Sequence, residues 1–537
     1  MARILVVTGR VAEGIVRRAV VYSGTKHCVE VVATPVPIAA FLTTDYIALY
    51  LKGLGVGPSD YDYILLPGLA RGSGRVIEDA IGIRAVKGTV NAYDLADLLK
   101  LDDLSILSPD RPADEVLQNA VLSGLRRILM DVENSLNASN SVAVGWVRVP
   151  ITPPPVRVVA EVAEAHTLAV DTLVGECLRL VESGAEIVSL GFEAYSPHPD
   201  AVRRLISLLR REVDVPIAID SSIPSEIDAA IESGADMVVN IDLTNVGEIG
   251  KVDRSVAVVT TPRDPATNVA PDDVDGRIRL LERAVDAVTA KGFEKVFADA
   301  ILDIPLSTFR SLLAFHRFKS LHPHTPMFMG VGNVVEMMDA DSVGVNAILT
   351  MLAQEIGVSL VLTVEKSQKA RGSTLECRVA SQMASVASIK NSPPKNIGLS
   401  LLVLKDKRLY EEPLWDGVDE AVEAAEEERP YTPDPMGVFR IRVDHRSGYI
   451  EALYIGRRGR ILIRGRSAKA VRHEIASRGL VSQVSHALYL GQELAKAEIA
   501  LRLGKSYIQE AQLFKIPQFV KLERGVTLSR GPQLKCR

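Results

Sequence analysis

Short apolar runs alternate with amphipathic stretches along most of the chain. Within residues 1–130 the runs ARILVVTG, CVEVVATP and DYILLPG are separated by stretches such as RVAEGIVRRAVVYSG, where apolar residues recur with helical spacing. This alternation of strand and helix is typical of βαβ units around a parallel sheet. We therefore predict an N-terminal α/β domain, with its linker, over residues 1–150.

A second region begins at three consecutive prolines, Pro153 to Pro155, which cannot lie inside a helix or a central strand. Apolar runs of strand length follow, separated by helix candidates that mostly end at glycine. The runs cover residues 156–161, 186–191, 216–220, 236–240, 256–260, 295–300, 327–330 and 359–364. Because these strands are apolar on both faces and each is followed by a helix, they predict a (β/α)8 TIM barrel over residues 151–390.

A third pattern begins at residue 391. An acidic, proline-punctuated run predicts a solvated helix and a linker. The stretch FRIRVDHRSGYIEALYIGRRGRILIRG then alternates apolar and polar residues around glycine-bearing turns, and a helix pair follows. The predicted fold class is therefore α/β, with the barrel flanked by the N-terminal parallel-sheet domain and by a C-terminal α+β domain over residues 391–537.

Composition excludes several classes of function. The 537-residue chain has a formal net charge of −5, which gives no sign of a nucleic-acid-binding protein. Its four cysteines lie far apart without CxxC spacing, and no apolar run reaches the roughly 18 residues of a membrane span. The sequence opens directly on a strand-like run, so we expect a cytoplasmic protein with reduced thiols and no structural zinc.

Polar residues follow the predicted barrel strands at their carboxyl ends, where the active sites of such barrels lie. They include Glu161, Glu164, His166, Glu193, His198, Asp220, Asn240, Asp242, Arg263, Asp299, Asn333, Glu336, Lys366, Lys369 and Arg371. Carboxylates and amides that converge there suit a flat heterocycle bearing hydrogen-bond donors and acceptors, and the cations of the last loop suit a phosphate. We expect neither His166 nor His198 to be catalytic, and we expect His322, His324 and His486 to be structural.

Several segments resemble the dihydropteroate synthases and the related pterin-binding methyltransferases. PIAIDSSIPSEIDAAIESGADMVVNIDLTN resembles their third and fourth strands, GAEIVSLGFEAYSPHP their second and KVFADAILDIP their sixth. The resemblance implies that Asp220, Asn240 and Asp299 contact a pterin, with Asp242 as a substitute for Asn240. The whole chain resembles the archaeal dihydropteroate synthase-related proteins, which are associated with methanopterin-type coenzymes.

The sequence also departs from the synthases. Glu161 stands near the position of their metal-binding asparagine, and the arginine after strand two and the lysine after strand seven are absent. The last strand runs into VEKSQKARGS in place of Arg-x-His, so we expect Lys366, Lys369 and Arg371 to supply the charge for a diphosphate. The resemblance implies Mg2+, with Glu161 as its ligand, a reduced pterin as substrate or ligand, and a homodimer.

The turn Gly330-Val331-Gly332-Asn333 resembles a Gly-x-Ser-Asn turn of pterin-dependent methyltransferases. We expect Gly330 and Gly332 to let the backbone leave the barrel closely beneath a bound ring, and Asn333 can hydrogen-bond a pterin nitrogen. Three hypotheses remain. The first is a transferase that joins a pterin-methyl diphosphate to an arylamine, in tetrahydromethanopterin or folate biosynthesis, with Asp220, Asn333 and Lys366 as catalytic residues. The second is methyl transfer from a pterin to a corrinoid protein, and the third is a pterin-binding module without turnover.

Overall fold

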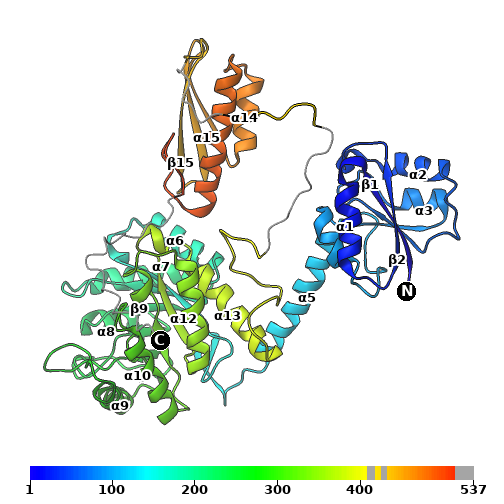
Figure 1. Ribbon diagram of the computed structural model, residues 1–537. Helices are drawn as coiled ribbons and strands as arrows, with labels where there is room; N and C mark the ends of the chain where they lie inside the picture. The colour runs from blue at the N-terminus through cyan, green and yellow to red at the C-terminus, as the bar shows by residue number, and fades with distance from the viewer. Residues whose placement is uncertain (408–417, 425–431, 515–537) are drawn as a thin grey trace, which may run out of the picture. The chain divides into compact units, whose positions relative to one another are not determined.

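The computed structural model describes residues 1–407, 418–424 and 432–514 (Figure 1). The chain divides into two compact units, Met1–Ala421 and Val422–Arg537. The first unit contains an N-terminal sheet and the barrel, and the second contains an antiparallel sheet with two helices.

The N-terminal sheet has four parallel strands in the order β2-β1-β3-β4. They are β1 (Arg3–Gly9), β2 (Cys28–Thr34), β3 (Tyr63–Leu66) and β4 (Arg84–Lys87). Helices α1 (Glu13–Ser23) and α4 (Leu95–Leu98) cover one face, and α2 (Thr44–Gly53) and α3 (Arg75–Ile81) cover the other. Successive residues of β1 alternate between the two apolar clusters, with Ile4 in one and Leu5 in the other. The predicted parallel sheet is confirmed.

Eight parallel strands form the barrel. They are β7 (Arg157–Val162), β8 (Ile187–Gly191), β9 (Ile217–Asp220), β10 (Met237–Val239), β11 (Ala257–Thr260), β12 (Lys295–Ala298), β13 (Phe328–Gly330) and β14 (Leu360–Val364). Neighbours in the chain are neighbours in the sheet, β14 pairs with β7, and a single bridge between Ala298 and Met327 joins β12 to the start of β13. Each predicted strand is present, so the barrel prediction is confirmed.

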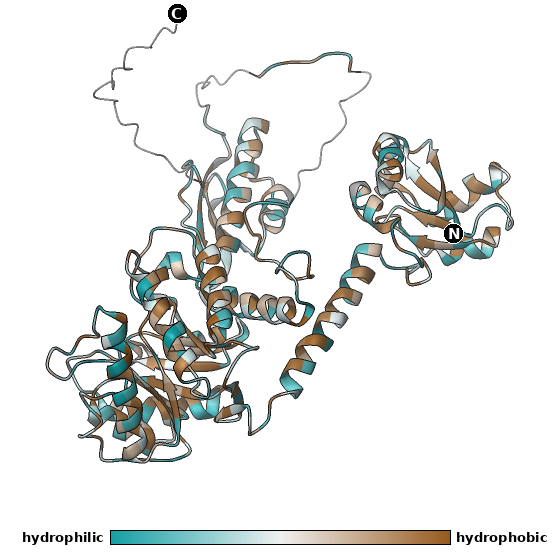
Figure 2. Cartoon of the chain, turned by 60° about the horizontal axis from the view of Figure 1, so that its bottom comes forward, coloured by the Kyte–Doolittle hydropathy of each residue, from teal (hydrophilic) through white to brown (hydrophobic). Residues whose placement is uncertain are grey.

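Helices surround the strands and bury an apolar stripe against them. They are α6 (Val170–Glu182), α7 (Pro199–Glu212), α8 (Pro224–Glu232), α9 (Val274–Lys291), α10 (Thr308–Leu321), α11 (Gly332–Val335), α12 (Ser342–Ile356) and α13 (Ser373–Lys390). In Figure 2 the strands of the barrel are mainly brown, and helices around them show teal on part of their surface. This is the pattern expected of strands buried on both faces.

A hairpin closes the amino end of the barrel. Its strands β5 (Ser141–Val144) and β6 (Val147–Pro150) are antiparallel, and Gly145 in the turn has a φ of 53°. The hairpin residues Val144 and Val149 pack in one cluster with interior residues of the barrel strands such as Phe297 and Phe328. The sequence analysis placed only a domain boundary in this region and did not predict the hairpin.

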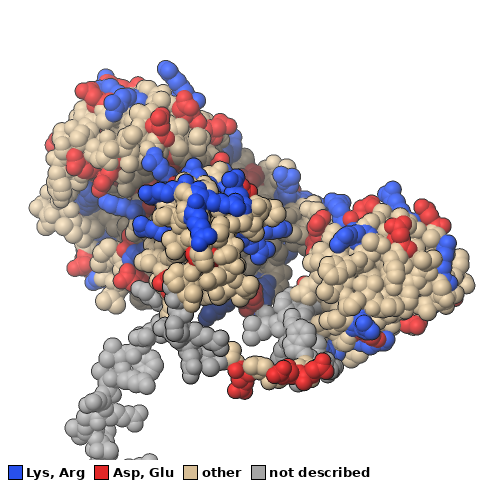
Figure 3. Space-filling model, turned by 90° about the horizontal axis from the view of Figure 1, so that it is seen from above, with Lys and Arg blue, Asp and Glu red and all other residues tan. Residues whose placement is uncertain are grey.

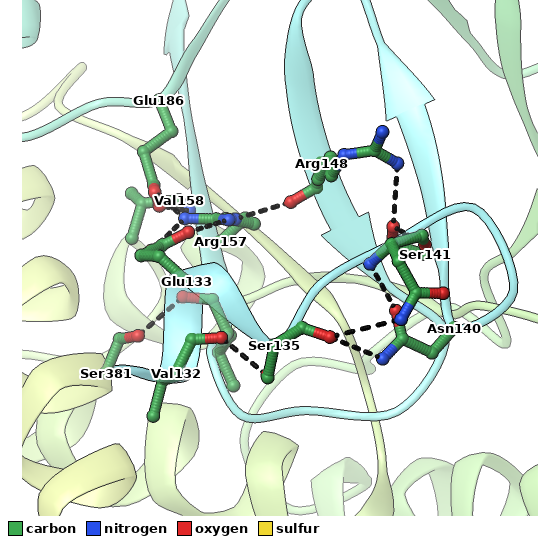
Figure 4. Close-up of polar contacts among 12 residues, drawn as sticks. Val132, Glu133, Ser135, Asn140, Ser141, Arg148, Arg157, Val158, Glu186 and Ser381 are labelled. Carbon is green, nitrogen blue, oxygen red and sulfur yellow. Dashed lines mark hydrogen bonds and ion pairs between the residues drawn. The ribbon is translucent and has the colours of Figure 1, made fainter. Parts of the chain in front are cut away.

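Arg157, the first residue of β7, connects this hairpin to the long helix α5 (Ala113–Asn134) (Figure 4). Its guanidinium binds both carboxylate oxygens of Glu133 at 2.7 and 2.6 Å and one oxygen of Glu186 at 2.5 Å. Its Nε donates to the carbonyl oxygen of Arg148 in β6 at 2.9 Å. Arg157 is only 4% exposed, so these partners must compensate for the hydration that its charge loses on burial.

The C-terminal unit contains a meander of β15 (Gly437–Asp444), β16 (Tyr449–Gly456) and β17 (Gly459–Gly465), packed against α14 (Ala468–Ser477) and α15 (Val484–Leu503). The predicted α+β arrangement is confirmed. His486 on α15 is buried, and its Nδ1 lies 3.1 Å from a carboxylate oxygen of Asp434. Backbone and hydroxyl groups of Ser482 also donate to Asp434, which holds the pKa of this carboxyl well below its usual range.

Charged residues are unevenly distributed over the C-terminal unit and the acidic segment before it (Figure 3). Exposed arginines line the meander and its turns: Arg440, Arg442, Arg457, Arg458, Arg460, Arg464 and Arg466. The described residues 418–424 of the acidic run are exposed and form neither helix nor strand, and the rest of the predicted acidic helix lies mostly outside the described residues. Among the described residues, no helix is both long and apolar enough to cross a bilayer.

Candidate functional site

Three carboxylic acids stand at the carboxyl ends of the barrel strands: Glu161 in β7, Asp220 at the end of β9, and Asp299 after β12. Burial raises the pKa of Glu161 to about 8, the charge of Asp220 adds to the shift, and Lys366 opposes it. Burial also raises the pKa of Asp299 to about 7, despite a hydrogen bond from the backbone nitrogen of Ile301 at 2.7 Å. Both acids therefore hold a proton for part of the neutral range.

The charge of Asp220 raises the pKa of both Glu161 and Asp299, so Asp220 is the central acid of the three. Burial raises its pKa, and a hydrogen bond from Asn240 and the charge of Arg263 oppose that shift. The Nδ2 atom of Asn240 lies 2.6 Å from Oδ1 of Asp220. Since β9 and β10 are paired strands, their ends bring these two side chains together, as the strand-end rule predicts.

The position of the Glu161 carboxyl depends on a glycine in the neighbouring strand. A Cβ atom placed on Gly191, the last residue of β8, would lie 2.2 Å from Oε1 of Glu161. Any side chain at position 191 would therefore displace the carboxyl group. Gly191 thus makes the space that lets Glu161 face the interior near Asp220.

Asp242, the substitute that the sequence offered for Asn240, lies in a different environment. It is fully buried and accepts hydrogen bonds from the backbone and hydroxyl of Thr244, at 2.8 and 2.6 Å, and from Thr261 at 2.9 Å. Its second oxygen lies 3.6 Å from Nε of Arg263. The structure therefore places Asn240 beside Asp220 and gives Asp242 the role of holding a loop and an arginine.

Arg263 is a site residue that the sequence analysis noted on the rim and assigned no role. It follows β11, it is partly exposed, and its charge lowers the pKa of both Asp220 and Asp299. The rule that selected the acids would have selected it as well, because it comes three residues after the end of a barrel strand. It supplies a cation in the middle of the carboxylic acids.

The three cations predicted to bind phosphate contact different segments. Lys366 is exposed and its Nζ lies 2.8 Å from Glu164 after β7, whereas Nζ of Lys369 donates to the carbonyl of Met338 at 2.9 Å. The charge of Arg371 acts on Glu176 in α6. Of the three, Lys366 is the one whose charge reaches Glu161. The phosphate assignment remains a prediction for all three.

The two glycines of the turn after β13 have different surroundings. A Cβ atom on Gly332 would lie 2.8 Å from Cγ1 of Val364, whereas the nearest atom to a Cβ on Gly330 would be the amide nitrogen of Asn333, at 3.7 Å. Asn333 is exposed, and its Nδ2 donates to the carbonyl of Leu302 at 2.9 Å. Gly332 therefore serves the packing of α11 against β14, and Asn333 connects the loops after β12 and β13.

Metal-binding groups gather elsewhere on the rim. Among the described residues, one group of three possible ligands lies close together, namely His166, Glu193 and His198. Glu161 is not part of any such group among the residues that the structure describes. Magnesium, and Glu161 as its ligand, therefore remain predictions.

Comparisons with known proteins match both units. The family described as "Pterin binding enzyme" matches residues 160–363, and the one described as "PterinBD-DUF4346" matches residues 433–510. An uncharacterized protein of Methanocaldococcus jannaschii is 34% identical over 526 residues, which cover 95% of this chain and 99% of that protein.

Solved structures of dihydropteroate synthases are also similar. The enzyme of Xanthomonas albilineans in complex with 7,8-dihydropteroate is 19% identical, with 47% of this chain and 100% of that chain covered and a TM-score of 0.36. The enzyme of Yersinia pestis is 14% identical, with 47% and 99% covered and a TM-score of 0.35. From the match of the barrel and the near-complete coverage of the archaeal relative, we conclude that the chain belongs to the dihydropteroate synthase-related family of pterin-binding proteins.

Proposed function

We propose that the protein is a transferase that joins a pterin-methyl diphosphate to an arylamine, in the biosynthesis of a tetrahydromethanopterin- or folate-type coenzyme. The observation that carries the proposal is the pairing of Asp220 with Asn240 beside Asp299, at the carboxyl end of a pterin-binding barrel. A pterin presents an amino group and a ring N–H along one edge and a carbonyl oxygen and ring nitrogens nearby. Carboxylates accept from the first two groups and an amide donates to the others.

The raised pKa values favour such a ligand. A buried carboxyl that lacks donors is held neutral, and a donor brought by the ligand favours its ionised form. Asp220 accepts from Asn240 and Asp299 from the backbone of Ile301, and we expect the pterin amino group and ring N–H to supply further donors to both carboxyls. Binding should then release a proton from Asp299, whose pKa is about 7, near neutral pH.

The proposed reaction takes place at the methylene carbon outside the ring. The amine nitrogen forms a bond to this carbon, the carbon–oxygen bond to the diphosphate breaks, and the diphosphate leaves with the electron pair. The amine loses one proton to solvent. Lys366, whose charge acts on Glu161, and Arg263, whose charge acts on Asp220, are the cations that we propose to stabilise the negative charge on the leaving oxygens.

A second function is favoured by the protonated acids. Methyl transfer from a pterin to a corrinoid requires a proton at a ring nitrogen of the leaving pterin. Glu161, with a pKa of about 8, and Asp299, with a pKa of about 7, can hold and donate a proton near neutral pH. This alternative uses the same pocket but does not use the cations after β14.

Fluorescence titration with a reduced pterin tests the pocket first. We expect Asp220→Ala and Asp299→Ala each to weaken binding by ~1.5–3 kcal/mol, because each leaves ring donors unpaired. Asp200→Ala is the control, because Asp200 is an exposed carboxylate on α7 that pairs only with its own helix neighbour Arg203. Wild-type pterin affinity in Asp220→Ala and Asp299→Ala, as in the control, would contradict the pterin assignment.

Two assays on the wild-type chain then separate the reactions. Diphosphate release from a pterin-methyl diphosphate and an arylamine supports the synthase, and methyl transfer to a reduced corrinoid supports the alternative. Pterin binding without either activity would support a binding module.

A further inference from the structure

His166, Glu193 and His198 meet at the rim above β7 and β8. His166 lies in the 3-10 turn Ala165–Thr167 after β7, and His198 precedes α7 after β8. Because β7 and β8 are parallel neighbours, the segments that follow them emerge side by side. The family resemblance assigns none of these three residues.

The distances suit a metal-binding group. Oε1 of Glu193 lies 2.7 Å from Nε2 of His198 and 3.7 Å from Nε2 of His166. The three ligand atoms all lie within 4.8 Å of one another. An ion placed between them would therefore reach two imidazole nitrogens and one carboxylate oxygen after small side-chain movements.

The two imidazole rings are held by packing. The His166 ring stacks between Phe192 and His198, at centroid distances of 5.5 and 4.3 Å. The backbone nitrogen of His198 donates to the buried carboxylate of Glu226 at 2.7 Å, which anchors the start of α7. The protein therefore orients the two rings before any ion binds.

His166 has a polar atom that the described protein leaves unsatisfied. Its side chain is 11% exposed, and Nδ1 has no hydrogen-bond partner among the described residues. A buried imidazole with so few polar contacts is costly unless a ligand compensates for the lost hydration. Nε2 of His166 lies 3.7 Å from Glu193, too far for a hydrogen bond, so a cation bound at Nε2 would give the neutral ring the strong polar contact it lacks, while Nδ1 carries the proton.

We propose that His166, Glu193 and His198 bind one divalent transition-metal ion of the zinc class. Two imidazoles and one carboxylate are a common ligand set for such ions, and three protein ligands leave at least one position open. Glu193 is 47% exposed and His198 is 30% exposed, so the open position faces solvent. Gly191, two residues before Glu193, faces the carboxyl of Glu161, so the segment that carries Glu193 begins beside the carboxylic acids.

Zn2+ titration of the metal-free full-length chain by calorimetry tests the site. We expect one Zn2+ per chain, and we expect His166→Ala, His198→Ala and Glu193→Gln each to weaken binding at least tenfold. His322→Ala is the matched control. His322 also lies 2.8 Å from a glutamate, Glu282, but that pair stands at the amino end of the barrel and has no third ligand within the described part of the chain. Its loss should leave Zn2+ affinity unchanged.

Cobalt substitution tests the open position. The visible spectrum of bound Co2+ should change when azide is added, because azide replaces a solvent ligand. Equal Zn2+ affinities for the wild type and the His166→Ala and His198→Ala variants, with unchanged thermal midpoints, would overturn the site. A Co2+ spectrum insensitive to azide would overturn the open position. Pterin titration of the metal-free chain tests the proposed function separately, so failure of one assignment is distinguishable from failure of the other.

Discussion

Asn240 donates a hydrogen bond to Asp220 over 2.6 Å while its own backbone is in the left-handed region, with a φ of 72°. Asparagine tolerates this conformation better than most residues with a side chain. One residue thus provides both the turn out of β10 and the donor for the central carboxylate. The pair links backbone geometry directly to the proposed pterin pocket.

The first prediction separates these two roles. Asn240→Gly keeps the left-handed backbone and removes the donor, so we expect pterin affinity to fall by ~1–3 kcal/mol with little change in the thermal midpoint. Asn268→Gly is the control, because Asn268 also has a positive φ, 57°, but lies in an exposed loop. Fluorescence titration should show wild-type affinity for that variant. Wild-type affinity for both variants would show that the hydrogen bond does not contribute to binding.

The second prediction concerns pH. Between about pH 4.5, the ordinary pKa of a glutamic acid, and pH 8, the folded chain keeps a proton on Glu161 that the unfolded chain has released. The unfolded state binds fewer protons in this window, so the free energy of unfolding of the barrel should fall as the pH rises from 5 to 8. Asp299, with a pKa of about 7, acts in the same direction.

Glu161→Gln should flatten this dependence, because glutamine has no proton to lose. Thermal midpoints measured from pH 5 to pH 9 provide the test, and the variant should gain most relative to the wild type at pH 9. Asp200→Asn, on the exposed surface of α7, should leave the wild-type slope unchanged. A wild-type slope in Glu161→Gln would mean that another group dominates the pH dependence.

The third prediction concerns the contacts of Arg157. Arg157→Ala leaves Glu133 without its bidentate partner at the junction of α5 and the barrel. Glu133 is 43% exposed, however, and Glu186 keeps Arg378, so we expect a loss of ~1.5–3 kcal/mol in the free energy of unfolding. Arg148→Ala is the control (Figure 4), because Arg148 is exposed and its guanidinium makes one long contact, 3.4 Å to Ser141. Denaturant unfolding followed by circular dichroism measures both. Similar losses in the two variants would show that burial of the ion pair is not the cause.

The fourth prediction separates Gly330 from Gly332. Gly332→Ala places a methyl group 2.8 Å from Val364, so we expect it to cost ~1–3 kcal/mol of stability, whereas Gly330→Ala has room for the methyl group. Val364→Ala should restore much of the stability when it is combined with Gly332→Ala. A double variant no more stable than Gly332→Ala alone would show that Val364 is not the obstacle.

The sequence predicted the barrel well because the same pattern, an apolar strand that in most cases is followed by a helix, occurs eight times. A shift of a residue or two at one end of a strand does not change the count. The position of an individual side chain is less predictable. Asn240 and Asp242 are two residues apart, but β10 ends at Val239, so strand alternation no longer indicates which way each side chain points.

Contacts between distant segments were the least predictable. The valines of the β5–β6 hairpin alternate around Gly145, which is a hairpin signal, but the adjacent prolines favoured a boundary. His166 and His198 are 32 positions apart, and only the pairing of β7 with β8 brings them together. Lys366, Lys369 and Arg371 are close in sequence, but a turn directs them to different partners.

The last prediction uses that difference to test the diphosphate. Lys366 is exposed, its Nζ pairs with the exposed Glu164 at 2.8 Å and its charge acts on Glu161, whereas the less exposed Lys369 donates to the Met338 carbonyl and pairs with Asp339 at 3.1 Å. If Lys366 binds the diphosphate, Lys366→Ala should weaken a pterin-methyl diphosphate by ~1.5–3 kcal/mol, the range of a charge-assisted hydrogen bond. The matching pterin alcohol should bind almost as it does to the wild type, because it carries no phosphate.

Lys369→Ala is the control for charge alone, since it removes one cation from the same loop. It should affect both ligands equally and weakly, because Lys369 is held on a backbone carbonyl of the loop after β13 and, unlike Lys366, does not act on Glu161. Competition titrations with the diphosphate and the alcohol measure the two affinities under one condition. Equal losses for both ligands in Lys366→Ala would argue against a diphosphate at this loop and would favour methyl transfer, because that reaction needs the acids of the pocket and not the cation.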